Sequence, residues 1–302
     1  MSLIGIVGSG NVGANTAFFL AERDVADVVL YDIQDGLSEG KALDMMEAAS
    51  VRGYRKHVAG SNKLADALDS EVCIIAAGSV RKPGMKREEL YSVNRDIVAD
   101  LAERMSGYNG IVIVVTEPVD YLTTLFLDSS KLDPARVIGL GGHLDATRLR
   151  YLIAKELGVS AQNVSAVVVG SHTDRMIPLA AYCKVSGIPV SSLMDASRLT
   201  EIFDDTRSAA DEIVDLAVRT NAYYGPAAAA SDLCEAVVRD SRQIVSASVR
   251  FSGQYGVDGI AMSLPIVLGE KGVIRVLEPK LEADQRKILE KSAERIRSVV
   301  TA

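Results

Sequence analysis

Apolar runs with the length of buried strands alternate with helix-length amphipathic segments through the first half of this chain. The strand-like runs are LIGIV, DVVLYD, EVCIIAAG, GIVIVVT and RVIGL, and the segments between them include NVGANTAFFLAER and EELYSVNRDIVADLAERM. Strands that alternate with helices build βαβ units, in which each crossover returns the chain to the same end of a parallel sheet. The pattern therefore predicts an α/β fold with a doubly wound parallel sheet.

The pattern changes near the glycine cluster GLGG at residues 139–142. We expect a helix from roughly His143 to Leu157, a strand VSAVVVG, and a helical stretch from about Ser191 to Asn221. The strand-like runs IVSASVRF, GIAMSLPIVLG and VIRVLE follow, and a charged amphipathic helix ends the chain. The change in pattern predicts two domains, a nucleotide-binding domain over residues 1–142 and an α+β substrate and catalytic domain over residues 143–302.

A glycine-rich turn joins the first strand to the first helix. Gly8, Gly10 and Gly13 have the G-x-G-x-x-G spacing, which provides a tight turn, close approach of a pyrophosphate and close packing of the helix on the sheet. Asp32 ends the next strand, where a carboxylate accepts hydrogen bonds from ribose hydroxyls and repels a 2′-phosphate. The sequence thus predicts a Rossmann domain that binds NAD in preference to NADP. The turn residues expected to contact the cofactor are Gly8, Ser9, Gly10, Asn11, Val12 and Gly13.

The segment RKPGMKR, residues 81–87, has an arginine at each end. It follows the run EVCIIAAG and precedes a helix starting near Glu88. Ligands of open α/β sheets bind at the carboxyl ends of strands, where this loop is expected to lie. A guanidinium recognises a carboxylate through a two-pronged hydrogen bond that lysine cannot reproduce. Arg81 and Arg87, on a loop hinged at Pro83 and Gly84, therefore predict a small substrate with more than one anionic group.

One of the three histidines has the setting of a catalytic residue. His172 directly follows a buried strand, and the segment LDATR places Asp145 and Arg148 on one face of a helix at i and i+3. A carboxylate and several arginines can converge on His172 in this architecture. His57 lies in a basic, exposed stretch and His143 at a helix start, and we interpret both as structural.

These segments occur in an order that resembles the lactate/malate dehydrogenase family over essentially the whole chain. The matching pieces are VGSGNVG, Asp32, AAGSVRKPGMKREEL, Asn94, VVTEPVD, GLGGHLDATRLR, GSHTDRMIP, AYYGPA and QYGVDG–LPIVLG. Within the family, RKPGMKR and AYYGPA resemble the malate branch, in which the first loop arginine meets the second carboxylate of oxaloacetate. The resemblance implies reversible NAD-dependent oxidation of (S)-malate to oxaloacetate by a homodimer or a tetramer built of two dimers.

The resemblance also implies a role for each matching residue. His172 is expected to be the general acid/base, and Asp145 to orient it and stabilise its imidazolium form. Arg148 is expected to bind the C1 carboxylate, Arg81 the distal carboxylate, and Arg87 to polarise the reacting carbonyl when the loop closes. The residues expected to border the nicotinamide side are Asn94, Val115, Thr116 and Glu117, the last also facing the substrate.

The chemistry of ketone reduction calls for these residue types independently. The cofactor supplies a hydride to carbon, and a histidine with a pKa near neutrality supplies a proton to oxygen and takes it back in the reverse direction. A neighbouring aspartate favours the charged imidazole. Negative charge that develops on the oxygen is stabilised by a preorganised cation, a role that suits Arg87. A loop that closes over the substrate also excludes water.

Two positions depart from the family pattern. Glu117 stands where the family has asparagine, and an ionised carboxylate there donates no hydrogen bond and repels a dianionic substrate. We expect it to be protonated, turned away or compensated by the arginines. Glu117–Pro118 matches a position that is cis in the family. Thr173 stands where the family has glycine, and because a β-branched residue is costly at positive φ, we expect the local backbone to have adjusted.

Composition and charge limit the partners of this chain of 302 residues. A net charge of −7 argues against a nucleic-acid surface, so anionic ligands must be attracted by local cations. No segment reaches the roughly 18 apolar residues of a membrane span, and the start SLIGIVG lacks a secretory n-region. The cysteines, Cys73, Cys183 and Cys234, lack metal-like spacing. We expect a cytoplasmic protein without a metal site, with Cys73 in the core.

Two alternative functions remain open. A dehydrogenase for another 2-hydroxy acid, such as lactate, would leave the Arg81 guanidinium unpaired beside the methyl group of pyruvate. A catalytically weak NAD-binding sensor or assembly protein is allowed by Glu117 and Thr173 and opposed by the intact polar set around His172. A purely structural α/β domain would leave that polar set unexplained.

Overall fold

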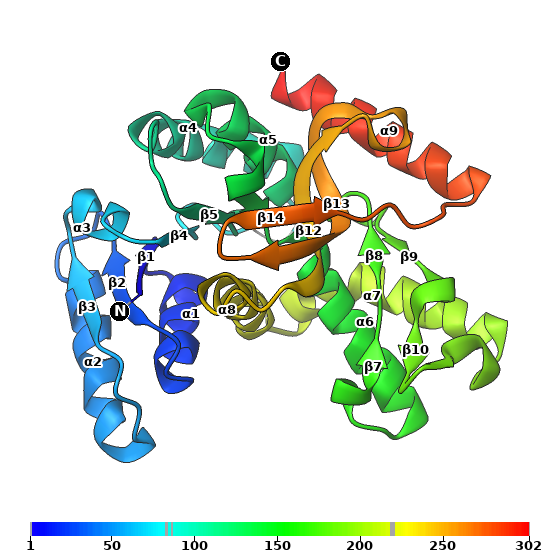
Figure 1. The fold of residues 1–302 in the computed structure, drawn as a ribbon, viewed down its shortest axis with the longest axis horizontal. Helices are drawn as coiled ribbons and strands as arrows, with labels where there is room; N and C mark the ends of the chain where they lie inside the picture. Colours follow the sequence, from blue (N-terminus) through cyan, green and yellow to red (C-terminus); the bar gives the residue numbers. More distant parts are fainter. Residues whose placement is uncertain (1, 82–83, 86, 218–220, 302) are drawn as a thin grey trace.

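The computed structural model of the chain describes residues 2–81, 84–85, 87–217 and 221–301. Within these residues, nine strands form one sheet in the order β14-β13-β12-β6-β5-β4-β1-β2-β3 (Figure 1). The parallel strands are β1 (Leu3–Val7), β2 (Asp27–Tyr31), β3 (Val58–Ser61), β4 (Val72–Ile75), β5 (Ile111–Val114) and β6 (Val137–Gly139). The antiparallel strands are β12 (Gln243–Ser252), β13 (Asp258–Gly269) and β14 (Gly272–Val276).

The strand order reverses between β1 and β4. Ile4 of β1 pairs with Val28 of β2 on one side and with Val72 of β4 on the other. The chain therefore winds outward in both directions from β1, and the loops after β1 and β4 diverge. This divergence opens a crevice at the carboxyl ends of the strands, the usual ligand site of a doubly wound sheet.

Helices cover both faces of the sheet (Figure 1). They are α1 (Asn11–Glu22), α2 (Leu37–Arg52), α3 (Leu64–Leu68), α4 (Arg87–Arg104), α5 (Val119–Ser130), α6 (Gly141–Leu157), α7 (Ala196–Ala217), α8 (Tyr224–Val238) and α9 (Ala283–Val300). Helices α4 and α5 pack together on one face, and α1 packs on α8 at the other. The small residues Ala227, Ala229 and Ala230 of α8 are buried, which permits the close helix packing.

The two halves of the chain share one continuous core. Ser248 of β12 pairs with Gly139 of β6, so the antiparallel strands extend the parallel sheet, and Ile75 and Ile266 belong to the same buried cluster. A smaller core surrounds α6 and α7, including Leu149. The domain division at residues 142 and 143 stays a prediction, and it falls inside the first turn of α6, which begins at residue 141.

Two predictions for the second half are wrong in their bounds. The run VSAVVVG forms two short strands, β7 (Val164–Ser165) and β8 (Val168–Val169), because each pairs with a different partner. Strand β7 joins β10 (Lys184–Val185) and β11 (Ile188–Pro189), whereas β8 pairs with β9 (Ile177–Pro178). The helix expected from Ser191 is α7, which begins at Ala196 after a 3₁₀ turn. In the first half of the chain, the predicted strands did not include β3.

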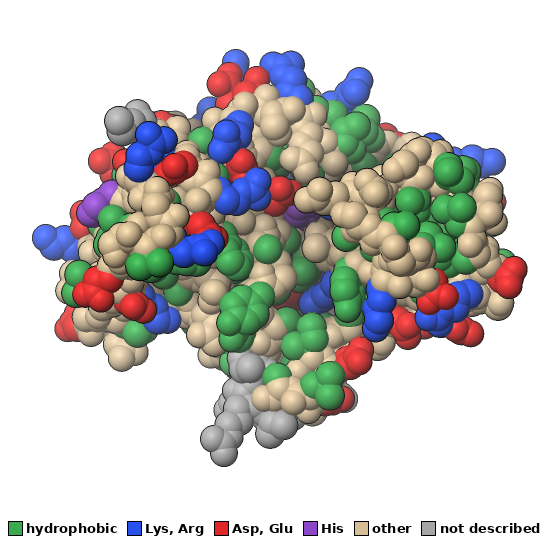
Figure 2. Space-filling model, turned by 90° about the horizontal axis from the view of Figure 1, so that it is seen from below, with side chains coloured by type: hydrophobic (Ala, Val, Ile, Leu, Met, Phe, Trp, Pro, Cys, Tyr) green, Lys and Arg blue, Asp and Glu red, His purple; other side chains and the backbone are tan. Residues whose placement is uncertain are grey.

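The surface charges, the helix lengths and the cysteines bear on the predictions made from composition. Basic and acidic side chains are interspersed on the face shown in Figure 2, and this face carries no continuous basic patch. No helix in the described ranges combines the length and apolarity that crossing a bilayer requires. All three cysteines are free and buried, and Cys73 is fully buried within β4, which confirms its expected place in the core.

Candidate active site

Two glycines of the first turn leave no room for a side chain, and the third faces open space. Gly8 adopts φ +101°, and a Cβ on Gly13 would lie 1.9 Å from the carbonyl oxygen of Gly8, so neither position accepts a side chain without a shift. Gly10 is the N-cap of α1 and has no side chain that could cap the first N–H groups of the helix. A Cβ built on it would meet nothing within 4 Å. The amino terminus of α1 therefore faces open space, which suits the pyrophosphate of a dinucleotide.

Asp32 lies beside this turn at the end of β2. Its Oδ2 accepts hydrogen bonds from the backbone N–H of Ser9 at 2.8 Å and from the Ser9 hydroxyl at 2.9 Å, and its Oδ1 accepts one from the N–H of Gln34. Partial burial opposes ionisation, but the hydrogen bonds from Gln34 and Ser9 outweigh it and lower the pKa of Asp32. An ionised acceptor at this position fits the ribose hydroxyls of NAD.

Asn94 connects the loops that follow β4 and β5. Its side-chain oxygen accepts from the N–H of Ser79 at 2.7 Å, and its Nδ2 donates to the carbonyl of Glu117 at 2.7 Å. Thr116 donates its hydroxyl hydrogen to the carbonyl of Ala77, which adds a second link between the loops. The Glu117–Pro118 peptide bond is cis, as the family resemblance implied. These contacts bring the residues expected at the nicotinamide side to one edge of the crevice.

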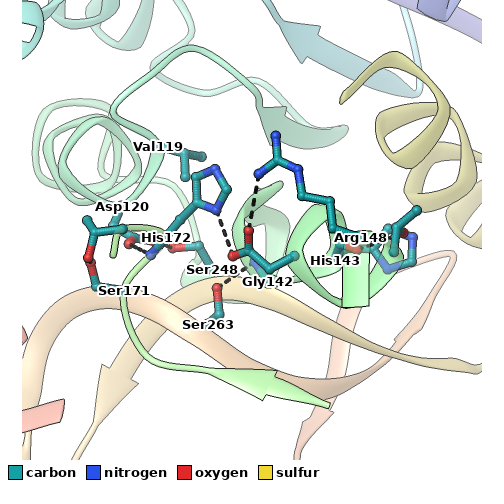
Figure 3. Close-up of polar contacts among 12 residues, drawn as sticks. Val119, Asp120, Gly142, His143, Arg148, Ser171, His172, Ser248 and Ser263 are labelled. Atoms are coloured by element: carbon teal, nitrogen blue, oxygen red, sulfur yellow. Dashed lines mark hydrogen bonds and ion pairs between the residues drawn. The ribbon is translucent and has the colours of Figure 1, made fainter. Parts of the chain in front are cut away.

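His172 is fixed at both ends of its ring and through its backbone. Nδ1 lies 2.7 Å from Asp145 Oδ2, and Nε2 lies 3.0 Å from Glu117 Oε1. The backbone N–H of His172 donates to Asp120 Oδ2 at 2.6 Å, and Asp120 Oδ1 accepts from the Ser248 hydroxyl. Figure 3 shows the side chains of His172, on a loop, and Arg148, on a helix, converging on one carboxylate, that of Asp145. The imidazole is therefore held in one orientation.

Carboxylates on two sides determine the charge of this imidazole. Burial lowers the pKa of His172, but Asp145 and Glu117 outweigh the burial and raise that pKa to about 10. The ring is therefore doubly protonated at neutral pH. Burial raises the pKa of Asp120 to about 6, although the hydrogen bonds from Ser248 and His172 oppose the rise.

The arginines approach the same place from separate elements. Arg148 Nη1 lies 3.5 Å from Asp145 Oδ1, one turn away on α6, and its side chain is largely buried. Arg81 forms an ion pair with Asp211 of α7, and its carbonyl accepts from the side chain of Asn221. Arg87 is the first residue of α4, but its side chain lies outside the described residues, as do Lys82, Pro83 and Lys86.

A cavity of about 160 Å³ joins these groups. Its lining includes Val12 from α1, Thr116 and Glu117 from the loop after β5, and the side chains of Arg81, Arg148 and His172. It therefore connects the dinucleotide turn to the imidazole. A hydride donor at one end and a small anion at the other would meet beside His172.

Comparison with known proteins agrees with this geometry. Residues 2–139 match the family model for the lactate/malate dehydrogenase NAD binding domain, and residues 142–302 match that for the lactate/malate dehydrogenase alpha/beta C-terminal domain. The chain belongs to the lactate/malate dehydrogenase family. Membership confirms the predicted α/β fold class, the dehydrogenase class and NAD as the cofactor.

Relatives within the family span the whole chain. Malate dehydrogenase from Thermomicrobium roseum is 43% identical over 301 residues, covering 99% of this chain and 97% of that protein. The crystal structure of malate dehydrogenase from Cryptosporidium parvum has a TM-score of 0.96 at 35% identity, covering 99% and 98% of the two chains. The lactate dehydrogenase from the same organism, complexed with lactic acid and the cofactor NAD, has a TM-score of 0.94 at 36% identity, covering 99% and 97%.

Both departures from the family pattern have a local explanation. The backbone at Thr173 does not adopt a positive φ, so the β-branched side chain is accommodated there without that strain. The Thr173 hydroxyl accepts from the Ser171 hydroxyl and from the N–H of Arg175, which stabilises the loop after His172. Glu117 is turned toward His172, so the expectation that its side chain turns away is wrong.

Sequence reasoning missed Asp120, which anchors the backbone of His172 from α5. In the sequence, Asp120 is a carboxylate beside the apolar start of a helix. Because it is far from His172 along the chain, no local pattern indicates their contact. His143 lies 2.8 Å from Asp232 of α8 through its Nε2, and His57 is exposed, which agrees with the structural interpretation of both histidines.

Proposed function

We propose that this chain is an NAD-dependent malate dehydrogenase that interconverts (S)-malate and oxaloacetate. The observation that carries the proposal is the position of His172, which faces the cavity with buried Asp145 behind it and Arg148 beside it. Identity of 43% to a malate dehydrogenase along the whole chain supports the choice of substrate.

His172 exchanges the proton in this proposal. When bound, NAD accepts the hydride from malate, or NADH supplies it to oxaloacetate. Nε2 takes up or delivers the proton of the substrate oxygen, while Asp145 at Nδ1 fixes the ring orientation and stabilises the imidazolium form. Asp120 holds the backbone of His172, so that the ring has a defined position relative to the cavity.

The arginines bind the two carboxylates. Arg148, on the helix that carries Asp145, forks onto the C1 carboxylate. Arg81 lines the cavity and binds the distal carboxylate after exchanging its partner Asp211 for the substrate. Arg87 polarises the reacting carbonyl, a role carried over from the family pattern because its side chain lies outside the described residues.

The ion pair between Arg81 and Asp211 favours one alternative, a lactate dehydrogenase. If the pair persists when substrate binds, the distal carboxylate has no partner and pyruvate becomes the better substrate. The test compares kcat/KM for oxaloacetate and pyruvate by NADH consumption, in the unsubstituted protein and in Arg81→Gln. We expect oxaloacetate to be preferred and the preference to fall by about tenfold or more in Arg81→Gln.

Two controls complete this test. Arg207→Gln removes a guanidinium that pairs with Asp204 on α7, and it should leave the preference unchanged. His172→Asn should abolish turnover while NADH still binds. A preference for pyruvate in the unsubstituted protein would reject the malate assignment, and the absence of turnover with tight NADH binding would favour the sensor or assembly function.

The same proposal includes a homodimer or homotetramer. Leu43 and Val51 of α2 are exposed apolar side chains, and burying them against a second copy would remove them from water. Light scattering of the purified protein measures the assembly directly. The cytoplasmic location stays a prediction.

A further inference from the structure

Glu117 occupies the place from which a substrate oxygen would meet His172. Its Oε1 lies 3.0 Å from His172 Nε2, and its Oε2 accepts from the backbone N–H of Val119 at 3.2 Å. The side chain of Glu117 is 38% exposed, whereas that of His172 is 6% exposed. The carboxylate therefore lies between the imidazole and the open part of the cavity.

We propose that Glu117 holds the transferable proton on His172 in the free enzyme and leaves Nε2 when a substrate oxygen takes its place. The proposal rests on the proposed function, in which Nε2 exchanges a proton with the substrate. Glu117 thereby makes the free enzyme ready for reduction of a 2-oxo acid at neutral pH. It makes oxidation of the alcohol depend on prior loss of that proton.

The proton balance gives the direction of this effect. In reduction, the N–H bond at Nε2 breaks and the proton passes to the substrate oxygen, while the hydride supplied by NADH adds to carbon. In oxidation, the substrate O–H bond breaks and neutral Nε2 accepts the proton as NAD takes the hydride. Reduction therefore requires imidazolium, and oxidation requires neutral imidazole.

Among the described residues, three carboxylates and one cation face His172 from the elements packed around it. Asp145 contacts Nδ1 and Glu117 contacts Nε2, and both stabilise the imidazolium form and raise the pKa of His172 against its burial. These described groups are Asp145 and Arg148 on α6, Glu117 on the loop after β5, and Asp120 on α5. Glu117 is the most exposed of the carboxylates that contact the ring, so it is the one that a ligand can displace.

Glu117 also affects binding of the substrate. Oxaloacetate brings two negative charges into a cavity that already contains this carboxylate, so binding requires Glu117 to withdraw as well as the arginines to attract. The repulsion is smaller for pyruvate, which carries one charge. Removing the charge of Glu117 should therefore lower KM for oxaloacetate more than KM for pyruvate.

The test measures the protonation of His172 in Glu117→Gln and Glu117→Asn. Proton-detected NMR titration follows the imidazoles, and the chain has only three histidines, with His57 and His143 as internal references. We expect both substitutions to lower the pKa of His172 by about one pH unit or more, because one of its two carboxylate partners loses its charge. Asp174→Asn is the matched control, since this exposed carboxylate does not contact the imidazole.

Kinetics supply the second measurement. The pH dependence of kcat/KM reports the pKa of the free enzyme, so the profiles for both directions should move to lower pH by the same amount as the NMR titration. A pKa of His172 unchanged in both folded variants would overturn the proposal. No turnover of the unsubstituted protein would instead reject the proposed function, and the titration would still decide whether Glu117 holds the proton.

Discussion

Replacing Asp120 with asparagine is expected to stabilise the protein at neutral pH. Asp120 is 2% exposed, and its two oxygens accept from the backbone N–H of His172 and the hydroxyl of Ser248, both at 2.6 Å. An asparagine oxygen can accept from the same N–H, and its amide can donate to the hydroxyl oxygen of Ser248. The substitution thus keeps two hydrogen bonds and removes a buried charge.

The magnitude follows from the pKa of Asp120, which burial raises from 3.8 to about 6. Between these two values the native state binds the proton more tightly than the unfolded state, so the free energy of unfolding falls as pH rises through this window. A shift of about two pH units corresponds to about 3 kcal/mol. The stability of Asp120→Asn relative to the unsubstituted protein should therefore increase by about 3 kcal/mol between about pH 4 and pH 7.

Urea denaturation of the cofactor-free protein at several pH values in this range measures the difference. Asp205→Asn, which replaces an exposed carboxylate on α7, is the control and should show no such trend. A difference between Asp120→Asn and the unsubstituted protein that stays constant with pH would refute the reasoning, because ionised Asp120 would then carry no burial penalty.

The remaining predictions concern the cofactor turn and the partner of the imidazole. Gly13→Ala should weaken NADH binding by more than about tenfold in fluorescence titrations, because its methyl group would meet the carbonyl of Gly8. Gly40→Ala on α2 meets nothing within 4 Å and should leave NADH binding unchanged. Asp145→Asn should lower kcat/KM by about 100-fold and lower the pKa of His172, and kinetics within threefold of the unsubstituted protein would contradict its role.

The cofactor turn could be predicted because its determinants are close together in the sequence. Gly8, Gly10 and Gly13 occupy one strand-to-helix turn, and Asp32 ends the next strand, so spacing alone indicates the geometry. The helix that carries Asp145 was also predictable, because its periodic pattern is local. The bounds of short strands were not, since pairing partners far along the chain determine where VSAVVVG divides.

The contacts that tune the site could not be predicted from the sequence. Asp120 meets His172 across 52 positions, and Arg81 meets Asp211 across 130. No periodicity relates such pairs, and only the packing of α5 and α7 against the loops brings them together. The direction of the Glu117 side chain is likewise a tertiary property, because the imidazole that attracts it lies on a separate loop.

A crystal structure with NADH and a non-reacting dicarboxylate, such as malonate, tests the central claim most directly. The account predicts one carboxylate on Arg148, the other on Arg81 in place of Asp211, and the Nε2 of His172 facing the ligand beside the nicotinamide ring. A ligand bound elsewhere, with the imidazole of His172 turned away from the nicotinamide, would contradict the account.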